Sequence, residues 1–176
     1  MEKTNLKTNI VLIGMAGSGK STVGSELARV LNVAFVDVDM LIEESRQTPL
    51  QELLDGLGVQ GFRKAEEQVL LGIDVKHHVI ATGGSAIYSQ VGMDHLRESS
   101  VLVLLEVDLD ILKQRVGNFG DRGLVKTRGQ SFEDVYGERL PLYKKNADIV
   151  VDCSDRSVSA ICNFIVAQIS DSSYHF

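Results

Sequence analysis

The sequence predicts an α/β fold, a three-layer sandwich in which helices cover both faces of a five-stranded parallel sheet. Short runs of β-branched and other apolar residues alternate with longer segments in which apolar residues recur at helical spacing. The apolar runs are continuous instead of alternating with polar residues, which is typical of parallel strands buried on both faces. These two observations account for most of the chain, so we expect a single domain over residues 1–176.

Five apolar runs are expected to form the strands. The run at 9–13 ends at Gly14, and the run at 101–105 is the clearest buried-strand pattern in the chain. The expected strands are residues 9–13, 34–37, 79–81, 101–105 and 149–151. Ligands bind beyond the carboxyl ends of the strands in such sheets, so residues that follow these runs are the first candidates for a functional site.

Helical periodicity accounts for the segments between the strands. Val23, Leu27 and Leu31 recur at helical spacing after the first strand. At the start of a later helix, Thr48 is expected to be the N-cap and Pro49 the first helical residue. The expected helices are residues 20–31, 39–45, 49–54, 61–73, 90–98, 109–116, 131–145 and 157–169.

Composition and charge narrow the class of protein. Hydrophobic residues make up 44% of the chain and charged residues 24%, as in ordinary globular domains. The net charge of -6 argues against a broad nucleic-acid-binding face, and no apolar stretch is long enough for a signal-peptide core or a membrane span. Cys153 and Cys162 lack metal-ligand spacing, so we expect two buried thiols. We expect a cytoplasmic monomer that binds neither nucleic acid nor membrane.

Residues 14–21, Gly-Met-Ala-Gly-Ser-Gly-Lys-Ser, match the phosphate-binding pattern G-x-x-x-x-G-K-[ST] in full. The segment follows an expected strand and opens an expected helix, where backbone N–H groups and the helix dipole favour phosphate oxygens. Lys20 is predicted to neutralise charge on the β- and γ-phosphates of ATP, and the Ser21 hydroxyl to ligate Mg²⁺. The expected nucleotide-binding residues of the loop are Gly17, Ser18, Gly19, Lys20, Ser21 and Thr22.

Two carboxylates stand at the tip of the second strand. Asp37 and Asp39 are two residues apart, so they can hold Mg²⁺ or form hydrogen bonds with hydroxyl groups of a ligand. Asp39 is also a candidate N-cap for the helix that follows. The two interpretations of Asp39 are compatible.

Charged and glycine residues further along the chain suggest a ligand that carries a carboxylate. Arg63 and Glu66 share one helical face, so we expect Glu66 to hold the guanidinium group and Arg63 to grip a ligand carboxylate bidentately. A surface ion pair is the alternative interpretation. Gly83 and Gly84 follow the third strand and allow a ligand to approach the backbone closely.

Together with the Arg-x-Pro-x-Tyr segment that begins at Arg139, these motifs resemble the shikimate kinases. That family is a branch of the nucleoside-monophosphate-kinase-like fold among the P-loop NTPases. The resemblance extends from about Asn9 to about Ile169 and rests on five segments in the expected order. It implies ATP- and Mg²⁺-dependent transfer of a phosphoryl group to shikimate, giving shikimate 3-phosphate in aromatic amino-acid biosynthesis.

The resemblance also implies a division of the domain and roles for particular residues. The acceptor-binding region would span about 38–74 and a mobile lid about 117–130, with Arg122 bringing positive charge to ATP and the transferring phosphoryl group. Asp39 would bind the acceptor hydroxyl and act as its base. The implied metal-binding residues are Ser21 and Asp37, and the implied acceptor-binding residues are Asp39, Arg63, Gly83, Gly84 and Arg139.

Two arginines on one site would repel each other without an anion between them, so an acidic acceptor is the economical explanation for Arg63 and Arg139. Candidates for adenine contacts, by position alone, are Arg115 and Arg156.

Two departures from the family pattern leave the acceptor open. Ser85 stands where a third glycine is usual, and Gly123 where proline is usual. The Ser85 hydroxyl is expected either to contact the substrate or to cap the next helix. The alternatives are a kinase of another hydroxy acid such as gluconate or homoserine, a nucleoside-monophosphate kinase, and a non-catalytic ATP-binding regulator.

Overall fold

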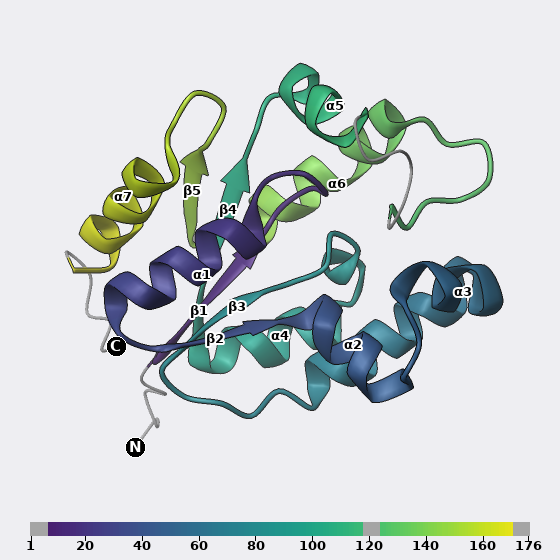
Figure 1. Cartoon of the computed structure of the whole chain (residues 1–176), viewed down its shortest axis with the longest axis horizontal. Helices are drawn as coiled ribbons and strands as arrows, with labels where there is room; N and C mark the ends of the chain where they lie inside the picture. Colours follow the sequence, from purple (N-terminus) through teal and green to yellow (C-terminus); the bar gives the residue numbers. More distant parts are fainter. Residues whose placement is uncertain (1–6, 118–123, 171–176) are drawn as a thin grey trace.

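The structure is a computed structural model that describes residues 7–117 and 124–170. Its centre is a five-stranded parallel sheet with the strand order β2-β3-β1-β4-β5 (Figure 1). The strands are β1 (Asn9–Ile13), β2 (Ala34–Asp37), β3 (His78–Ala81), β4 (Ser100–Glu106) and β5 (Ile149–Asp152). The predicted fold class and all five predicted strands are confirmed.

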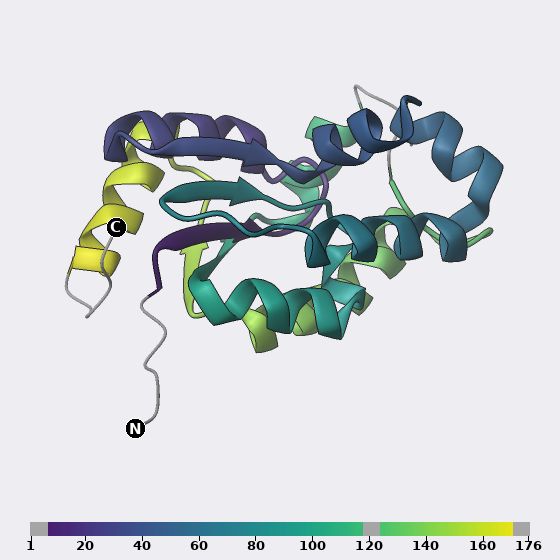
Figure 2. The ribbon, with the colours of Figure 1, turned by 90° about the horizontal axis from the view of Figure 1, so that it is seen from below.

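Helices cover both faces of the sheet and make the three-layer sandwich that the sequence predicts. In Figure 2, α1 and α7 lie on one face of the sheet, and α4 and α6 on the other. The helices are α1 (Lys20–Leu31), α2 (Val38–Arg46), α3 (Leu50–Leu71), α4 (Gln90–Ser99), α5 (Leu109–Gly117), α6 (Phe132–Asn146) and α7 (Val158–Ser170), with a short 3-10 helix η1 (Ala86–Tyr88). The 3-10 helix was not predicted.

The order of the strands determines where a ligand-binding crevice can form. β1 lies between β3 and β4, so the chain leaves β1 toward one side of the sheet and crosses to the other side between β3 and β4. A crevice opens at the carboxyl end of a strand where the order reverses in this way. The glycine-rich loop after β1 lies at that point, and β2 and β3 end beside it.

The central strands form the middle of the core. Every residue of β1 is buried, as are all residues of β4 except Glu106. Burial of one large aliphatic side chain contributes about 1.5–3 kcal/mol, so these strands hold the loops at their carboxyl ends on a rigid base. Cys153 and Cys162 are free buried thiols, as expected.

The two helices expected over 49–54 and 61–73 are both present, and together they form the element α3. This element runs from Leu50 to Leu71, and Gly58, whose φ of 65° and ψ of 175° suit a residue without a side chain, separates the two helices within it. Thr48 is not the N-cap. Pro49 takes that position without a side-chain bond, and the Glu43 carboxylate accepts the Leu50 N–H at 2.8 Å. A residue from the preceding helix therefore supplies the capping interaction.

Candidate active site

The glycine-rich loop curls around the mouth of a cleft of about 620 Å³. Gly17 has φ +81°, and a Cβ there would lie 2.9 Å from Cγ2 of Val116, so both the backbone conformation and the space require glycine. Gly19 is the N-cap of α1 and provides no side-chain bond. The first-turn N–H groups of α1 therefore remain available to an anion. The loop residues Gly17, Ser18, Gly19, Lys20, Ser21 and Thr22 all line the cleft.

Lys20 provides a cation inside this cleft. Its Nζ donates hydrogen bonds to the carbonyl oxygens of Gly14 and Met15, both at 2.8 Å. Burial lowers the pKa of Lys20 to about 8, an effect that the nearby Asp39 carboxylate opposes. The amine therefore keeps its proton at neutral pH and can balance phosphate charge.

The two carboxylates after β2 have different surroundings. Asp37 accepts a hydrogen bond from the Ser21 hydroxyl at 2.6 Å and one from the Asp39 N–H at 3.0 Å. Asp37 is thus the N-cap of α2, and the capping interpretation of Asp39 is wrong. The Asp39 side chain instead faces the cleft. Burial raises the pKa of Asp39, and Lys20 counteracts the rise.

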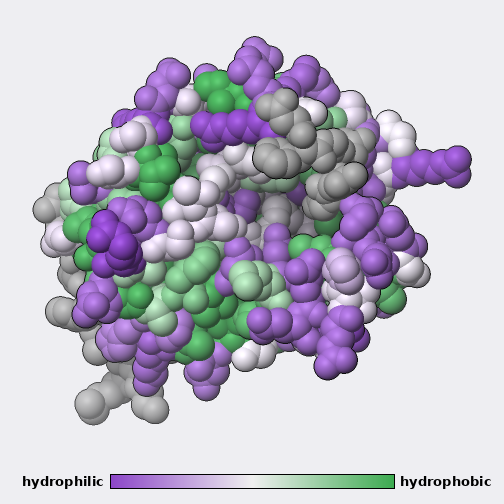
Figure 3. Space-filling view, viewed as in Figure 1, coloured by the Kyte–Doolittle hydropathy of each residue, from purple (hydrophilic) through white to green (hydrophobic). Residues whose placement is uncertain are grey.

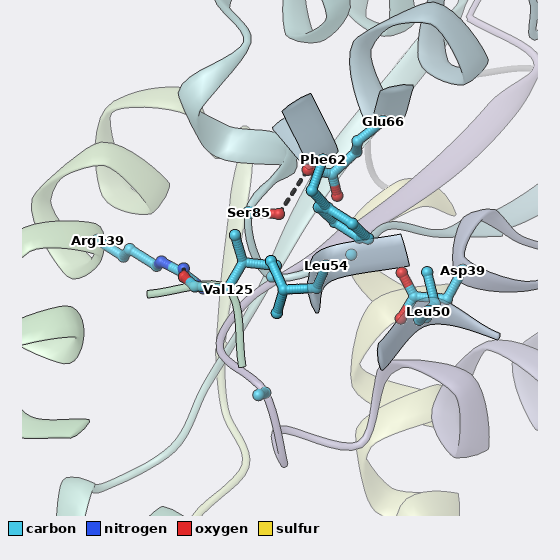
Figure 4. Close-up of a pocket in the computed structure, with 11 residues that line it drawn as sticks. Asp39, Leu50, Leu54, Phe62, Glu66, Ser85, Val125 and Arg139 are labelled. Atoms are coloured by element: carbon cyan, nitrogen blue, oxygen red, sulfur yellow. Dashed lines mark hydrogen bonds between the residues drawn. The ribbon is translucent and has the colours of Figure 1, made fainter. Parts of the chain in front are cut away.

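A second, smaller cavity of about 30 Å³ adjoins the cleft. Figure 4 shows Arg139 on one side of it and Asp39 on the opposite side, with Val125 and Leu54 between them. Ala16, Asp39, Leu50 and Gly84 line both the small cavity and the cleft. The space-filling view shows this face of the molecule hollowed near its centre (Figure 3).

Gly83 and Gly84 form part of the wall of the small cavity. A Cβ at Gly83 would collide with Oε1 of Glu66 and lie 2.8 Å from Oδ1 of Asp39. The Tyr143 hydroxyl donates to the Gly84 carbonyl at 2.5 Å, and burial raises the pKa of Tyr143 well above its usual value, so the hydroxyl keeps its proton. The second half of the Arg-x-Pro-x-Tyr segment thus holds the glycine backbone.

Arg139 is the cation of the small cavity. It is only 1% exposed, and its Nη2 donates to the Val125 carbonyl. A Cβ at Gly84 would lie 3.1 Å from Nη1 of Arg139, so glycine at this position leaves room for the guanidinium group. A buried guanidinium group that donates to a neutral carbonyl can exchange this acceptor for a ligand carboxylate, so it suits an acidic ligand.

The expected pairing of Arg63 with Glu66 is wrong. Glu66 accepts a hydrogen bond from Ser85 at 2.5 Å, drawn as the dashed line in Figure 4. The Arg63 guanidinium carbon instead lies 3.6 Å from the centroid of the Tyr88 ring. Glu66 is 1% exposed, and its bonded partner is a buried hydroxyl from the segment after β3, not the half-buried arginine on its own helix.

Burial raises the pKa of Glu66 to about 7, although the Ser85 bond opposes the rise. Ser85 does not cap the next helix, because Ser89 caps α4 by accepting the Gly92 N–H at 3.0 Å.

Two arginines stand at the far end of the cleft. Arg115 donates from Nη1 to the Gly17 carbonyl at 3.3 Å, and the Arg156 guanidinium carbon lies 5.0 Å from the Phe164 ring centroid. Both line the cleft together with the apolar residues Val158 and Ile161. This end can accept a flat base between apolar and cationic groups.

The expected lid arginine, Arg122, and its neighbour Gly123 lie outside the described residues. The described part of that segment begins at Leu124 and Val125, both buried. Leu124 lines the cleft and Val125 lines the small cavity. Within residues 7–117 and 124–170, no helix has the length and apolar character to cross a bilayer.

Sequence reasoning missed Tyr88 and the part that Tyr143 plays. Tyr143 lies four residues after Arg139, so helical spacing placed both on one face of α6 and was a usable signal. Tyr88 stands in a 3-10 turn after β3, where no periodicity distinguishes it.

A phosphate loop at the carboxyl edge of a parallel sheet, beside a pocket with one carboxylate and one buried arginine, defines a P-loop kinase of small molecules, a phosphotransferase with an alcohol acceptor. The family model for shikimate kinase matches residues 16–170. The chain belongs to the shikimate kinase family.

Individual relatives agree with this assignment. A shikimate kinase from Vibrio campbellii is 36% identical over 168 residues, which are 94% of this chain and 98% of that relative. The structure of shikimate kinase from Acinetobacter baumannii in complex with shikimate has a TM-score of 0.85 and 28% identity, covering 95% of each chain. Thymidylate kinase from Candida albicans, with a TM-score of 0.61 and 12% identity over 94% of this chain and 92% of its own, shares the fold alone.

Proposed function

We propose that this protein transfers the γ-phosphoryl group of ATP to a hydroxyl of shikimate, giving ADP and shikimate 3-phosphate. The observation that carries the proposal is the wall shared by the cleft and the small cavity, which includes Asp39 and Gly84. A hydroxyl held at Asp39 would face a phosphate held by the loop. We refer to the cleft as the nucleotide cleft and to the small cavity as the acceptor pocket.

The phosphate loop would hold the nucleotide. N–H groups at the start of α1 would bind phosphate oxygens, and Lys20 would exchange its two carbonyl partners for oxygens of the β- and γ-phosphates. Arg115 and Arg156 would flank the base. Thr22 lines the same cleft and would lie near the phosphates.

The residues present fit a Mg²⁺ ion bound together with nucleotide. Ser21 and Asp37 offer two hard oxygen atoms at the mouth of the cleft, already 2.6 Å apart. Among the described residues there is no cluster of three or more His, Cys, Asp or Glu side chains that could hold a metal, so phosphate oxygens and water would complete the coordination. The ion would neutralise charge on the phosphates.

The acceptor pocket would orient shikimate by its two ends. Arg139 would bind the carboxylate with its two-pronged guanidinium group, and Gly83 and Gly84 would allow the ring to approach the backbone. Arg63 does not line the pocket, but it lies against the Tyr88 ring that Arg139 also contacts, and from there it would join Arg139 at the carboxylate. Asp39, on the opposite side of the pocket, would accept the hydrogen bond of the attacking hydroxyl.

The reaction follows from this arrangement. The acceptor oxygen attacks the γ-phosphorus, the bond to the bridging oxygen of ADP breaks, and the hydroxyl proton passes to the Asp39 carboxylate. Lys20 and Arg122 would balance the charge on the transferring group. Catalysis is then mainly positioning and charge stabilisation.

Two other kinase functions remain as alternatives to shikimate. Gluconate or homoserine would also place a carboxylate at Arg139, and a nucleoside monophosphate would place a phosphate there. Membership of the shikimate kinase family favours shikimate. A non-catalytic regulator is disfavoured, because binding ATP alone needs no pocket with a buried arginine.

The test is ADP release with ATP and Mg²⁺, with and without shikimate, for the wild type and Arg139→Ala. We expect strong shikimate-dependent release in the wild type and a loss of about 100-fold or more in kcat/KM for shikimate in the variant. Arg29→Ala, which removes an exposed arginine paired with Glu26 on α1, is the matched control and should behave as the wild type. If ADP release did not increase with shikimate while the protein still bound ATP, the kinase fold would stand but shikimate would not be its acceptor.

We also propose that the chain acts as a single-domain cytoplasmic monomer that does not bind nucleic acid. The net charge of -6 supports the last part, since nucleic-acid affinity depends on neutralising phosphates. Light scattering after size-exclusion chromatography would test the oligomeric state.

A further inference from the structure

Tyr88 connects the two arginines of the proposed acceptor site. The guanidinium carbon of Arg63, on α3, lies 3.6 Å from the Tyr88 ring centroid, and that of Arg139, on α6, lies 5.2 Å from it. Both distances fall within the range in which a cation is attracted to an aromatic ring. Arg139 also donates from Nε to the Tyr88 hydroxyl at 3.4 Å. One side chain of the short helix η1 therefore contacts both cations.

The hydroxyl of Tyr88 is oriented to act as an acceptor toward Arg139. Its single proton is donated to Oε1 of Glu138 at 2.7 Å, which leaves the lone pairs of the oxygen for the Arg139 Nε–H. Partial burial and the bond to Glu138 raise the pKa of Tyr88, so this donor persists above neutral pH. Glu138 is itself held by the Gln130 side-chain amide at 2.9 Å.

The ring contacts the Arg63 guanidinium group, whose charge interacts with Glu66 and Glu138 but which forms no ion pair with either carboxylate in the described residues. Glu66 is bound to Ser85, and Nε of Arg63 is buried without a hydrogen-bond partner in the described part of the chain. Two neighbouring guanidinium groups repel each other, and the negative face of the Tyr88 ring is a partner that contacts both of them, in addition to the charges of Glu66 and Glu138. Neither Arg63 nor Tyr88 lines the acceptor pocket, whereas Arg139 does. Tyr88 thus acts from behind the pocket wall.

We propose that Tyr88 is a positioning residue that holds Arg63 beside Arg139, so that an acceptor carboxylate meets both guanidinium groups. The Tyr88 ring contacts the Arg63 guanidinium group, and the Tyr88 hydroxyl accepts the hydrogen bond from Arg139. Removing the hydroxyl and removing the ring should therefore have separable effects. This inference rests on the proposed function, because it presumes that the two arginines bind the acceptor carboxylate.

The experiment compares shikimate with its uncharged methyl ester as acceptors for the wild type, Tyr88→Phe and Tyr88→Leu. Tyr88→Leu should raise KM for shikimate about tenfold and leave KM for ATP unchanged. The preference for shikimate over the ester, as a ratio of kcat/KM values, should fall by a similar factor, because the ester carries no charge for the arginines. Tyr88→Phe keeps the ring and should lose about threefold in the same ratio.

Tyr136→Leu is the matched control, because Tyr136 is also half-buried but lines neither the nucleotide cleft nor the acceptor pocket. A purely structural effect would change the KM values for shikimate, for its ester and for ATP together, both in Tyr88→Leu and in Tyr136→Leu. That result, or a wild-type acceptor ratio in Tyr88→Leu, would overturn the proposal. If Tyr88→Leu does not fold, an unchanged shikimate-to-ester ratio in Tyr88→Phe would overturn the proposed role of the Tyr88 hydroxyl at Arg139. Tyr88→Met, if it folds, would then test the role of the ring at Arg63 in the same assay.

Calorimetric binding of shikimate separates the two proposals. A wild type that binds shikimate without phosphorylating it would refute the proposed function alone, and the dissociation constants of the Tyr88 variants would then decide the role of Tyr88. A wild type that neither binds nor phosphorylates shikimate would refute both. Wild-type turnover with unaltered Tyr88 variants would refute only the inference about Tyr88.

Discussion

Ser85→Ala should destabilise the protein by an amount that depends on pH. The Ser85 hydroxyl is 2.5 Å from Oε2 of Glu66, a buried carboxylate whose other oxygen has no partner in the described residues. A hydrogen bond to a charged group contributes about 1.5–3 kcal/mol, and its loss leaves the carboxylate with the full cost of desolvation. Above pH 7, where Glu66 is mostly ionised, we expect the free energy of unfolding to fall by about 2 kcal/mol.

The sign of the pH dependence follows from the pKa of Glu66, which is raised in the folded protein from 4.5 to about 7. A group with a raised folded-state pKa contributes stability below its unfolded-state pKa and loses it as pH rises through the folded-state value. The Ser85 bond limits this loss, because it favours the ionised carboxylate. As pH falls through 7, Glu66 takes up its proton and the bond becomes a neutral one, so the effect of Ser85→Ala should shrink to about 1 kcal/mol.

The assay is urea denaturation followed by far-ultraviolet circular dichroism at pH 8.5 and pH 5.5, since the chain has no tryptophan. Ser25→Ala is the matched control, an exposed α1 serine whose hydroxyl donates to the Thr22 carbonyl at 3.1 Å, and it should cost little at either pH. Equal losses for Ser85→Ala at both pH values would refute the argument from charge. No loss at either pH would refute the hydrogen bond itself.

Two further predictions concern the acceptor pocket and the nucleotide cleft. Gly83→Ala should raise KM for the acceptor at least about tenfold and leave KM for ATP nearly unchanged, because the new Cβ would displace the Asp39 and Glu66 carboxylates. Gly137→Ala, in open space on α6, is the control, and equal effects of the two substitutions would contradict the reasoning. The kcat/KM for ATP should fall as pH rises through about 8, the pKa of Lys20 in the free protein, and a profile that stays flat to about pH 9.5 would show that the Lys20 charge is not needed.

The local sequence pattern was sufficient to predict the sheet and the phosphate loop. The continuous apolar runs of β1 and β4 are typical of strands buried on both faces, and the loop between β1 and α1 matches the phosphate-binding pattern in full between a strand and a helix. Asp39 was placed at the right edge of the sheet because residues after parallel strands gather there, whereas Arg139 lies within α6 and was placed by the family resemblance.

Partners across the pocket were beyond the reach of periodicity. Helical spacing puts Arg63 and Glu66 on one face of α3, but it does not show which residues pack against that face. In the structure Ser85, from the segment after β3, donates to Glu66, and Tyr88 from the same segment contacts Arg63. The N-cap of α2 depends in the same way on the conformation of Asp37, which no residue pattern specifies. Such details depend on packing between distant segments, and only the folded chain defines them.

The contact between Arg139 and Val125 has a consequence for how an acceptor enters. The acceptor pocket holds about 30 Å³, room for only one or two water molecules, and the Val125 carbonyl takes a donor that an acceptor carboxylate would need. A carboxylate carries a full opposite charge and can accept two parallel N–H bonds from Arg139, whereas the Val125 carbonyl is neutral, so we expect the exchange to be favourable. We therefore expect the Val125 carbonyl to give up its bond to Arg139 as the acceptor binds. Because its neighbour Leu124 lines the nucleotide cleft, we expect the same displacement to change the shape of that cleft.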